Sequence, residues 1–294
     1  MNSYDNETNY GKYVWKKFKS IMVPFWIFSF LSIVIYIIDT NGSLWDVAYL
    51  VTRIARGNIR NEFVASSLWF LCCLFVIELI FKLIKYLKNK ILIFVICLVL
   101  FWASNTLIVP CPIVFLHWWY NIDSAFYYII YFEIGYVSYP IILWLFKYDT
   151  NIKKYILWIS GIASFVYSAL LFLGESCIVD CLDNVLGSFA VIVSSCITIW
   201  LNCLVAKLLE DIQLFQVIGK ETLYLCGNEY LIKTIVNCIL QVFGMSIQAN
   251  SPLIFYILTM SLLIVGVKLV IPYEKKLIGY IMNKICKNKS FCSC

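Results

Sequence analysis

The fold class follows from residues 64–90, which read VASSLWFLCCLFVIELIFKLIKYLKNK. Their apolar run is long enough for a helix that crosses the hydrocarbon core of a bilayer, which takes about 20 residues. The run ends in a cluster of lysines at positions 82, 85, 88 and 90. Short loops rich in Lys stay in the cytoplasm, so this segment predicts both a membrane span and its orientation.

The composition of the whole chain agrees with a membrane protein. Of its 294 residues, 62% are hydrophobic and only 14% are charged, and the mean hydropathy is +0.86. A soluble domain of this size would not tolerate such a surface. The formal charge of +6 does not indicate a nucleic-acid partner, because the lysines are mostly confined to short turns between apolar runs.

Hydropathy along the chain predicts an all-α polytopic bundle, because open sheets cannot satisfy their backbone groups in lipid. Lysines gather between alternate spans, which places both termini in the cytoplasm and the protein in the cell (plasma) membrane. Residues 1–20 and the basic tail, residues 273–294, flank one transmembrane domain, residues 21–272. The eight predicted spans lie near residues 21–38, 64–87, 91–109, 124–146, 155–174, 185–206, 222–244 and 251–272.

Two outer segments have features of their own. Leu44 to Ile59 shows an apolar face and predicts an interfacial amphipathic helix. It is accompanied by the only basic residues in the outer segments, Arg53, Arg56 and Arg60. These arginines either contact lipid head groups or bind an anionic substrate. Cys177 and Cys181 share another outer loop and would pair if the compartment is oxidising.

Ionisable residues inside spans normally face a partner or a water-filled cavity. Glu229 and Lys233 are one turn apart and begin a polar stripe that Asn237 and Gln241 continue. This stripe is either an ion pair that joins two spans or the lining of a cavity for a polar substrate. The pair is expected near the middle of its span.

Three further carboxylates lie within the predicted spans or at their ends. Glu133 in the middle of its span is predicted to line an interior site, and Asp123 lies at the outer mouth of the same span, where acids favour helix N-termini. Glu78 is one turn before Lys82, and a surface pair explains it.

His117 is the sole histidine and therefore a candidate general base, although interfacial anchoring beside Trp118 and Trp119 explains it as well. The sequence shows no Gly-rich phosphate loop, no Ser-His-Asp pattern and no His/Cys spacing for a metal. From the residues alone, the chain is a polytopic membrane protein with a polar interior.

Four stretches in order along the chain resemble membrane acyltransferase family 3, the integral O-acyltransferases that modify bacterial polysaccharides and other glycans. The first resembles the basic segment that leads into that family's third span, and the last resembles the start of a late span. The stretches are KKFKSIMVPF (16–25), SLWFL followed by FVIE (67–71 and 75–78), NIDSA continuing to FEIGY (121–125 and 132–136) and IGKETLY (218–224).

The resemblance implies an enzyme that transfers an acyl group, acetyl in the first instance, from acyl-CoA to a glycan or glycolipid of the cell surface, with no bound cofactor. It implies that Lys16, Lys17 and Lys19 lie near the phosphates of the donor, which suits a cluster of point charges. The polar residues singled out above, Asp123, Glu133, Glu229 and Lys233 among them, are the candidates for substrate binding.

The chain also departs from the family pattern. The family typically has ten spans, with a catalytic His and a partner Arg in or beside the first, whereas this sequence starts just before the third. Gly227-Asn228-Glu229 stands where relatives often have a His. The chain is therefore expected to be a fragment, to have lost catalysis, or to use another group. The alternative function is a non-catalytic membrane protein, such as a polysaccharide exporter or polymerase subunit.

Overall fold

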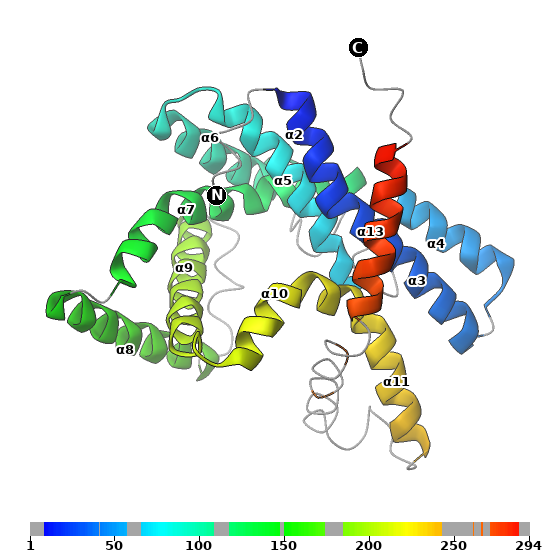
Figure 1. Ribbon diagram of the computed structural model, residues 1–294. Coiled ribbons are helices and arrows are strands. Elements are labelled where there is room, and N and C mark those ends of the chain that lie inside the picture. Colours follow the sequence, from blue (N-terminus) through cyan, green and yellow to red (C-terminus); the bar gives the residue numbers. More distant parts are fainter. Residues whose placement is uncertain are drawn as a thin grey trace. The chain divides into compact units, whose positions relative to one another are not determined.

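The computed structural model describes residues 9–40, 42–57, 66–108, 118–147, 150–173, 185–242, 261, 266 and 271–287. Throughout these residues the chain is helical or connects helices, with no strand, which confirms the all-α class. Figure 1 shows the helices coloured along the chain. Their bounds are α2 Tyr10–Lys17, α3 Val23–Thr40, α4 Leu44–Arg56, α5 Trp69–Lys85, α6 Lys90–Ala103, α7 Ile122–Leu145, α8 Asn151–Leu173, α9 Val185–Leu208, α10 Gln213–Gly227, α11 Glu229–Val242 and α13 Ile271–Lys287.

Three of the described helical stretches are long and apolar enough to cross a membrane. They cover 29 residues at Tyr10–Ile38, 27 at Trp119–Leu145 and 20 at Phe189–Leu208. A helix rises 1.5 Å per residue, so even the shortest reaches about 30 Å, the thickness of the hydrocarbon core. The length and apolar composition of these helices indicate a membrane protein. The number of eight spans and the orientation of the termini stay predictions.

The first span begins earlier than predicted. α2 runs into α3 through a π-helical turn, Phe18–Met22, so one continuous helical stretch starts at Tyr10 instead of Ile21. Asn9 caps it, with its side-chain oxygen accepting the Lys12 N–H at 3.3 Å. A side-chain acceptor at this position satisfies one of the first amide groups, which have no partner inside the helix.

The amphipathic helix predicted from Leu44 is α4. Ser43 and Asp46 form a reciprocal capping box at its start, and these hydrogen bonds from Ser43 lower the pKa of the Asp46 carboxyl. Gly57 ends the helix at a φ of 65°, a left-handed conformation that glycine adopts without steric cost. The helix therefore stops at Arg56, three residues before the predicted end.

The residues of the predicted span 222–244 form two helices instead of one. α10 ends at Gly227, Asn228 lies between, and α11 begins at Glu229; the ribbon changes direction there in Figure 1. The predicted span 251–272 lies almost wholly outside the described residues, as do Cys177 and Cys181. In the predicted basic tail, residues as far as Lys287 belong to the helix α13.

The chain divides into two compact units. The middle unit comprises Phe81–Phe115 and Phe126–Gln216, and the terminal unit comprises Asn2–Ile80, Leu116–Ala125 and Val217–Cys294. In the middle unit α8 and α9 pack along each other, with Phe146 stacked on Trp200 at 6.0 Å between ring centroids.

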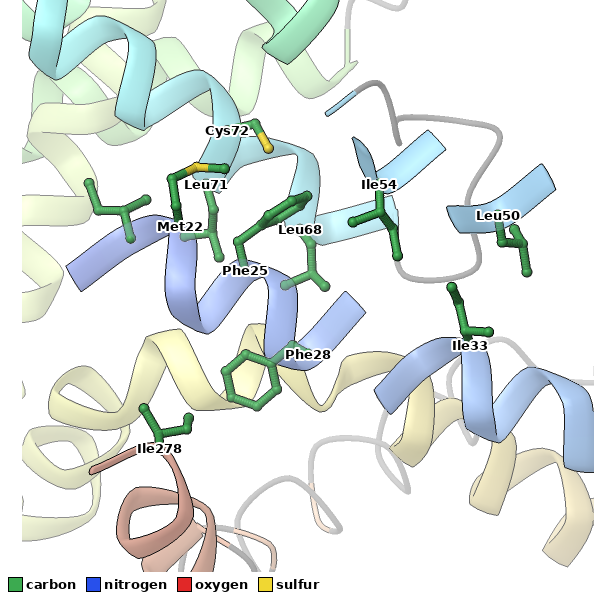
Figure 2. Packing of buried hydrophobic residues seen from close by; sticks show 11 residues of the cluster. Met22, Phe25, Phe28, Ile33, Leu50, Ile54, Leu68, Leu71, Cys72 and Ile278 are labelled. Carbon is green, nitrogen blue, oxygen red and sulfur yellow. The ribbon is translucent and has the colours of Figure 1, made fainter. Parts of the chain in front are cut away.

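The terminal unit has one apolar cluster, drawn in Figure 2, in which α3, α4, α5 and α13 meet. Phe25 and Phe28 of α3 are almost completely buried, as are Leu68 and Cys72 at the start of α5. This cluster holds together segments that are more than 200 residues apart in the chain, since Ile278 of α13 belongs to it.

Candidate functional site

A buried carboxylate connects α2 to α5 in the terminal unit. Lys17 Nζ lies 2.8 Å from Glu78 Oε1, and the Tyr13 hydroxyl donates a hydrogen bond to Glu78 Oε2. Tyr13 and Lys17 are four residues apart on the helix and so lie on the same face. We call Tyr13, Lys17 and Glu78 the α2–α5 triad.

The triad corrects the prediction that Glu78 forms a surface pair with Lys82. Glu78 is buried, and its partners come from 61 and 65 residues earlier in the chain. The ammonium of Lys82 lies over the ring of Tyr86, 5.9 Å from its centroid. A charge in a span needs a partner, and the packing of α2 on α5 supplies it.

The three lysines that the resemblance assigns to the acyl donor have different surroundings in the structure. Lys17 is paired with Glu78, whereas Lys16 is exposed. Lys19, in the π-helical turn, lies over the ring of Trp15 at 5.8 Å from its centroid. Of the three predicted residues, Lys16 is the one with an exposed side chain, while Lys17 and Lys19 are partly buried.

Three of the four stretches that carry the family resemblance contribute side chains to the apolar cluster of the terminal unit, and the start of the third is attached to it by a hydrogen bond. Met22 and Phe25 come from the first stretch, Leu68 and Leu71 from the second, and Tyr224 from the last. The third joins through Asn121, whose Nδ2 donates to the Trp69 carbonyl at 3.2 Å. The last also meets α3 directly, because the rings of Phe28 and Tyr224 pack edge to face at 5.8 Å.

Asp123 is completely buried at the start of α7. Its Oδ1 accepts the backbone N–H of Ser124 at 2.8 Å, and the Trp118 N–H approaches its Oδ2 at 3.5 Å. Just before it, Tyr120 and Asn121 adopt left-handed φ values of 56° and 55° in the turn that leads into α7. The structure thus agrees with the helix-start interpretation of this carboxylate, although we had expected a solvated one.

The two described arginines of the amphipathic helix α4 have different surroundings. Arg53 Nη2 donates to the Tyr49 hydroxyl at 2.8 Å, and its guanidinium lies 5.0 Å from the centroid of that ring. Arg56 is exposed at the end of α4, and Arg60 lies outside the described residues. Trp45, at the other end of α4, is 83% exposed. The two interpretations of the arginines, an anionic substrate and lipid head groups, both stay predictions.

The middle unit also contains a buried carboxylate. Glu133 of α7 is 3% exposed, and within the described parts of the chain no hydrogen-bond partner reaches its Oε2. The Lys85 ammonium acts electrostatically on this carboxylate, and it also donates to the Tyr136 hydroxyl, one turn along α7. A buried oxygen that lacks a partner is costly. Glu133 therefore lies in the interior, and that it lines a polar site stays a prediction.

A third set of polar residues lies around the junction of α10 and α11. Asn228 Nδ2 donates to the Tyr224 carbonyl at 2.9 Å and to Glu274 Oε2 at 2.8 Å. Burial raises the pKa of Glu274, which the hydrogen bond from Asn228 opposes. One turn earlier in α10, Glu221 pairs with Lys275. These contacts attach α13 to the junction, and sequence reasoning gave no reason to expect them.

The predicted ion pair between Glu229 and Lys233 is present, but its surroundings differ from the expectation. Glu229 is the first residue of α11, not a mid-span residue, and the side chains of Glu229 and Lys233 are 31% and 44% exposed. Asn237 continues the stripe, and its Oδ1 is buried with no hydrogen bond to the described residues. Gln241 is exposed.

We therefore expect weak coupling between Glu229 and Lys233. Glu229→Gln and Lys233→Met should each lower the free energy of unfolding by less than about 1 kcal/mol, because half-exposed i,i+4 pairs contribute little. The free energy of unfolding in detergent, measured for both single variants and the double, gives the coupling. A coupling of about 3 kcal/mol would show that the pair is buried in the working protein.

Two predicted residues, His117 and Arg60, lie outside the described part of the chain. Within that part, no group of three His, Cys, Asp or Glu side chains is arranged to hold a metal ion. Glu78 is the residue that sequence reasoning most clearly undervalued, and its signal was available, since a carboxylate surrounded by apolar residues needs a partner. Comparison with protein-family models, with curated proteins and with solved structures finds no match for this chain.

Proposed function

We propose that the protein takes part in O-acyl transfer at the membrane, with acyl-CoA as donor and a hydroxyl of a cell-surface glycan as acceptor. The observation that supports the proposal is that three of the four family-like stretches contribute to one apolar cluster, to which a hydrogen bond attaches the start of the other. Their contacts are consistent with a common scaffold that places the basic start of the chain beside α5.

The reaction forms an ester bond between the acyl carbon and the acceptor oxygen and breaks the thioester bond of the donor. The acceptor proton leaves to a base, and the CoA thiolate takes up a proton. In the proposal, Lys16 and Lys19 hold the donor phosphates, since ammonium groups are effective phosphate partners. Glu78 is assigned a positioning role, because it holds Lys17 and thereby α2 against α5.

Binding of acetyl-CoA to the protein in lipid nanodiscs tests the donor site without requiring turnover. The double variant Lys16→Ala, Lys19→Ala should bind acetyl-CoA about tenfold more weakly, which corresponds to about 1.4 kcal/mol. Lys147→Ala is the matched control, because Lys147 is also an exposed lysine on the predicted cytoplasmic side. Its affinity for acetyl-CoA should not change.

The same preparation distinguishes the alternative function. If the protein binds no acetyl-CoA at millimolar concentration, the acyltransferase proposal is wrong and a non-catalytic exporter or polymerase subunit becomes the better interpretation. If labelled acetyl is transferred to a polysaccharide acceptor, His117→Ala should abolish the rate, because His117 is the only imidazole in the chain.

A further inference from the structure

An apolar groove of about 600 Å³ runs between α8 and α9 in the middle unit. Its walls include Leu157, Trp158 and Ile162 of α8 and Leu204 and Leu208 of α9. The volume is within the range of sites that hold small organic ligands, roughly 300–1,000 Å³. None of the lining side chains carries a charge, so the occupant is a hydrocarbon.

The length of the groove along α8 is close to the thickness of the hydrocarbon layer in one leaflet of a bilayer. Its lining on α8 extends from Leu157 to Phe165, which is about 12 Å along a helix axis. Half of the roughly 30 Å hydrocarbon core is about 15 Å. Trp158, Ile162 and Phe165 are each more than 60% exposed, as expected for side chains that face a lipid chain instead of a neighbouring helix.

Positive charge is concentrated at one end of the groove. Lys154 precedes Leu157 and Trp158 by three and four residues and so lies on the groove face of α8. Lys207 is next to Leu208 on α9, where it pairs with Glu210 and lies 6.0 Å from the centroid of the Phe146 ring. In the sequence, residues 147–154 and 207–212 contain four lysines and three acids, Asp149, Glu210 and Asp211.

We propose that this groove binds one acyl chain of an anionic phospholipid, with the phosphate at the Lys154 end. The apolar lining accepts the chain, and the excess of cations favours a negative head group near the membrane surface. Close packing of α8 on α9 shapes the floor: a Cβ added at Gly161 would come within 3.3 Å of Leu204 Cδ1. The proposal is independent of the proposed acyl transfer.

Native mass spectrometry of the detergent-purified protein, titrated with phosphatidylglycerol or phosphatidylcholine of identical chains, tests the site. The unmodified protein should bind phosphatidylglycerol at least fivefold more tightly. Ile162→Trp fills the groove and should weaken binding of both lipids. Ile159→Trp is the matched control, because Ile159 is similarly exposed on α8 but does not line the groove. Lys154→Gln should remove only the preference for phosphatidylglycerol.

Three outcomes would overturn the proposal. Equal lipid binding by the Ile162→Trp and Ile159→Trp variants would show that the lipid lies elsewhere. Equal affinity of the unmodified protein for the two lipids would exclude an anionic head group. A dimer that Ile162→Trp converts to a monomer would show that a second copy fills the groove. Should Ile162→Trp fail to give a monodisperse protein, Leu208→Trp on the opposite wall provides the same test.

Discussion

Glu78→Gln is expected to lower the free energy of unfolding by about 3 kcal/mol or more. The substitution removes the charge that faces Lys17, whose side chain is only 17% exposed, and weakens the acceptor for Tyr13. Breaking a buried ion pair costs roughly 3–5 kcal/mol, because the remaining charge stays in a medium of low dielectric constant. Thermal unfolding of the protein in detergent, followed by its tryptophan fluorescence, measures the loss.

The double variant Glu78→Leu, Lys17→Met should recover most of this stability, because an apolar pair of similar volume needs no charge compensation. Glu210→Gln is the matched control, since Glu210 pairs with Lys207 at a position where its side chain is 48% exposed. Exposed pairs contribute less than about 1 kcal/mol. If Glu78→Gln were as mild as Glu210→Gln, α2 would not be held on α5 by this contact.

Gly227→Ala is expected to give the second large loss, about 1–3 kcal/mol. An added Cβ would overlap the ring of Phe28, with Cδ1 at only 2.6 Å. Phe28 is 1% exposed and packs on Tyr224, so its ring has little room to move. The change therefore pushes apart α3 and the end of α10, and the thermal midpoint in detergent should fall.

Gly219→Ala is the control on the same helix, because no described atom lies within 4 Å of an added Cβ there. Alanine favours helix over glycine by up to about 1 kcal/mol, so this variant should be neutral or more stable. Phe28→Leu combined with Gly227→Ala should lose less than the sum of the two single changes, since the contacts couple. Equal stability of Gly227→Ala and Gly219→Ala would contradict the close approach.

The helices were predictable from the sequence because their signals are local. Apolar runs that end in lysines located α5 and α9, a run preceded by lysines located α3, and the amphipathic pattern after Ser43 located α4. The break at Asn228 was not predictable in this way. The residues around it contact Phe28, which lies 199 residues before Gly227 and whose ring meets Gly227, and Glu274 of α13. A hydropathy window detects neither contact.

The same contrast holds for the candidate site residues. Glu229 and Lys233 are four residues apart, so their pairing could be predicted from helix geometry. Glu78 has an equally well-spaced lysine in Lys82, and packing also brings Lys17 to it from 61 residues earlier in the chain. Where a local and a distant partner compete, the outcome is decided by which helix faces which. The sequence pattern of one helix does not contain that information.

The π-helical turn at Phe18–Met22 has a geometric consequence for the whole first helix. Each residue of an α-helix advances by about 100° around the axis, whereas a π-turn accommodates an additional residue and changes the rotational phase of the residues after it. Tyr13 and Lys17 before the turn point to Glu78, and Phe25 and Phe28 after it point into the apolar cluster. The number of residues between Lys17 and Val23 therefore sets the angle between these two faces, and a regular α-helix with the same number of residues would not present both to their partners.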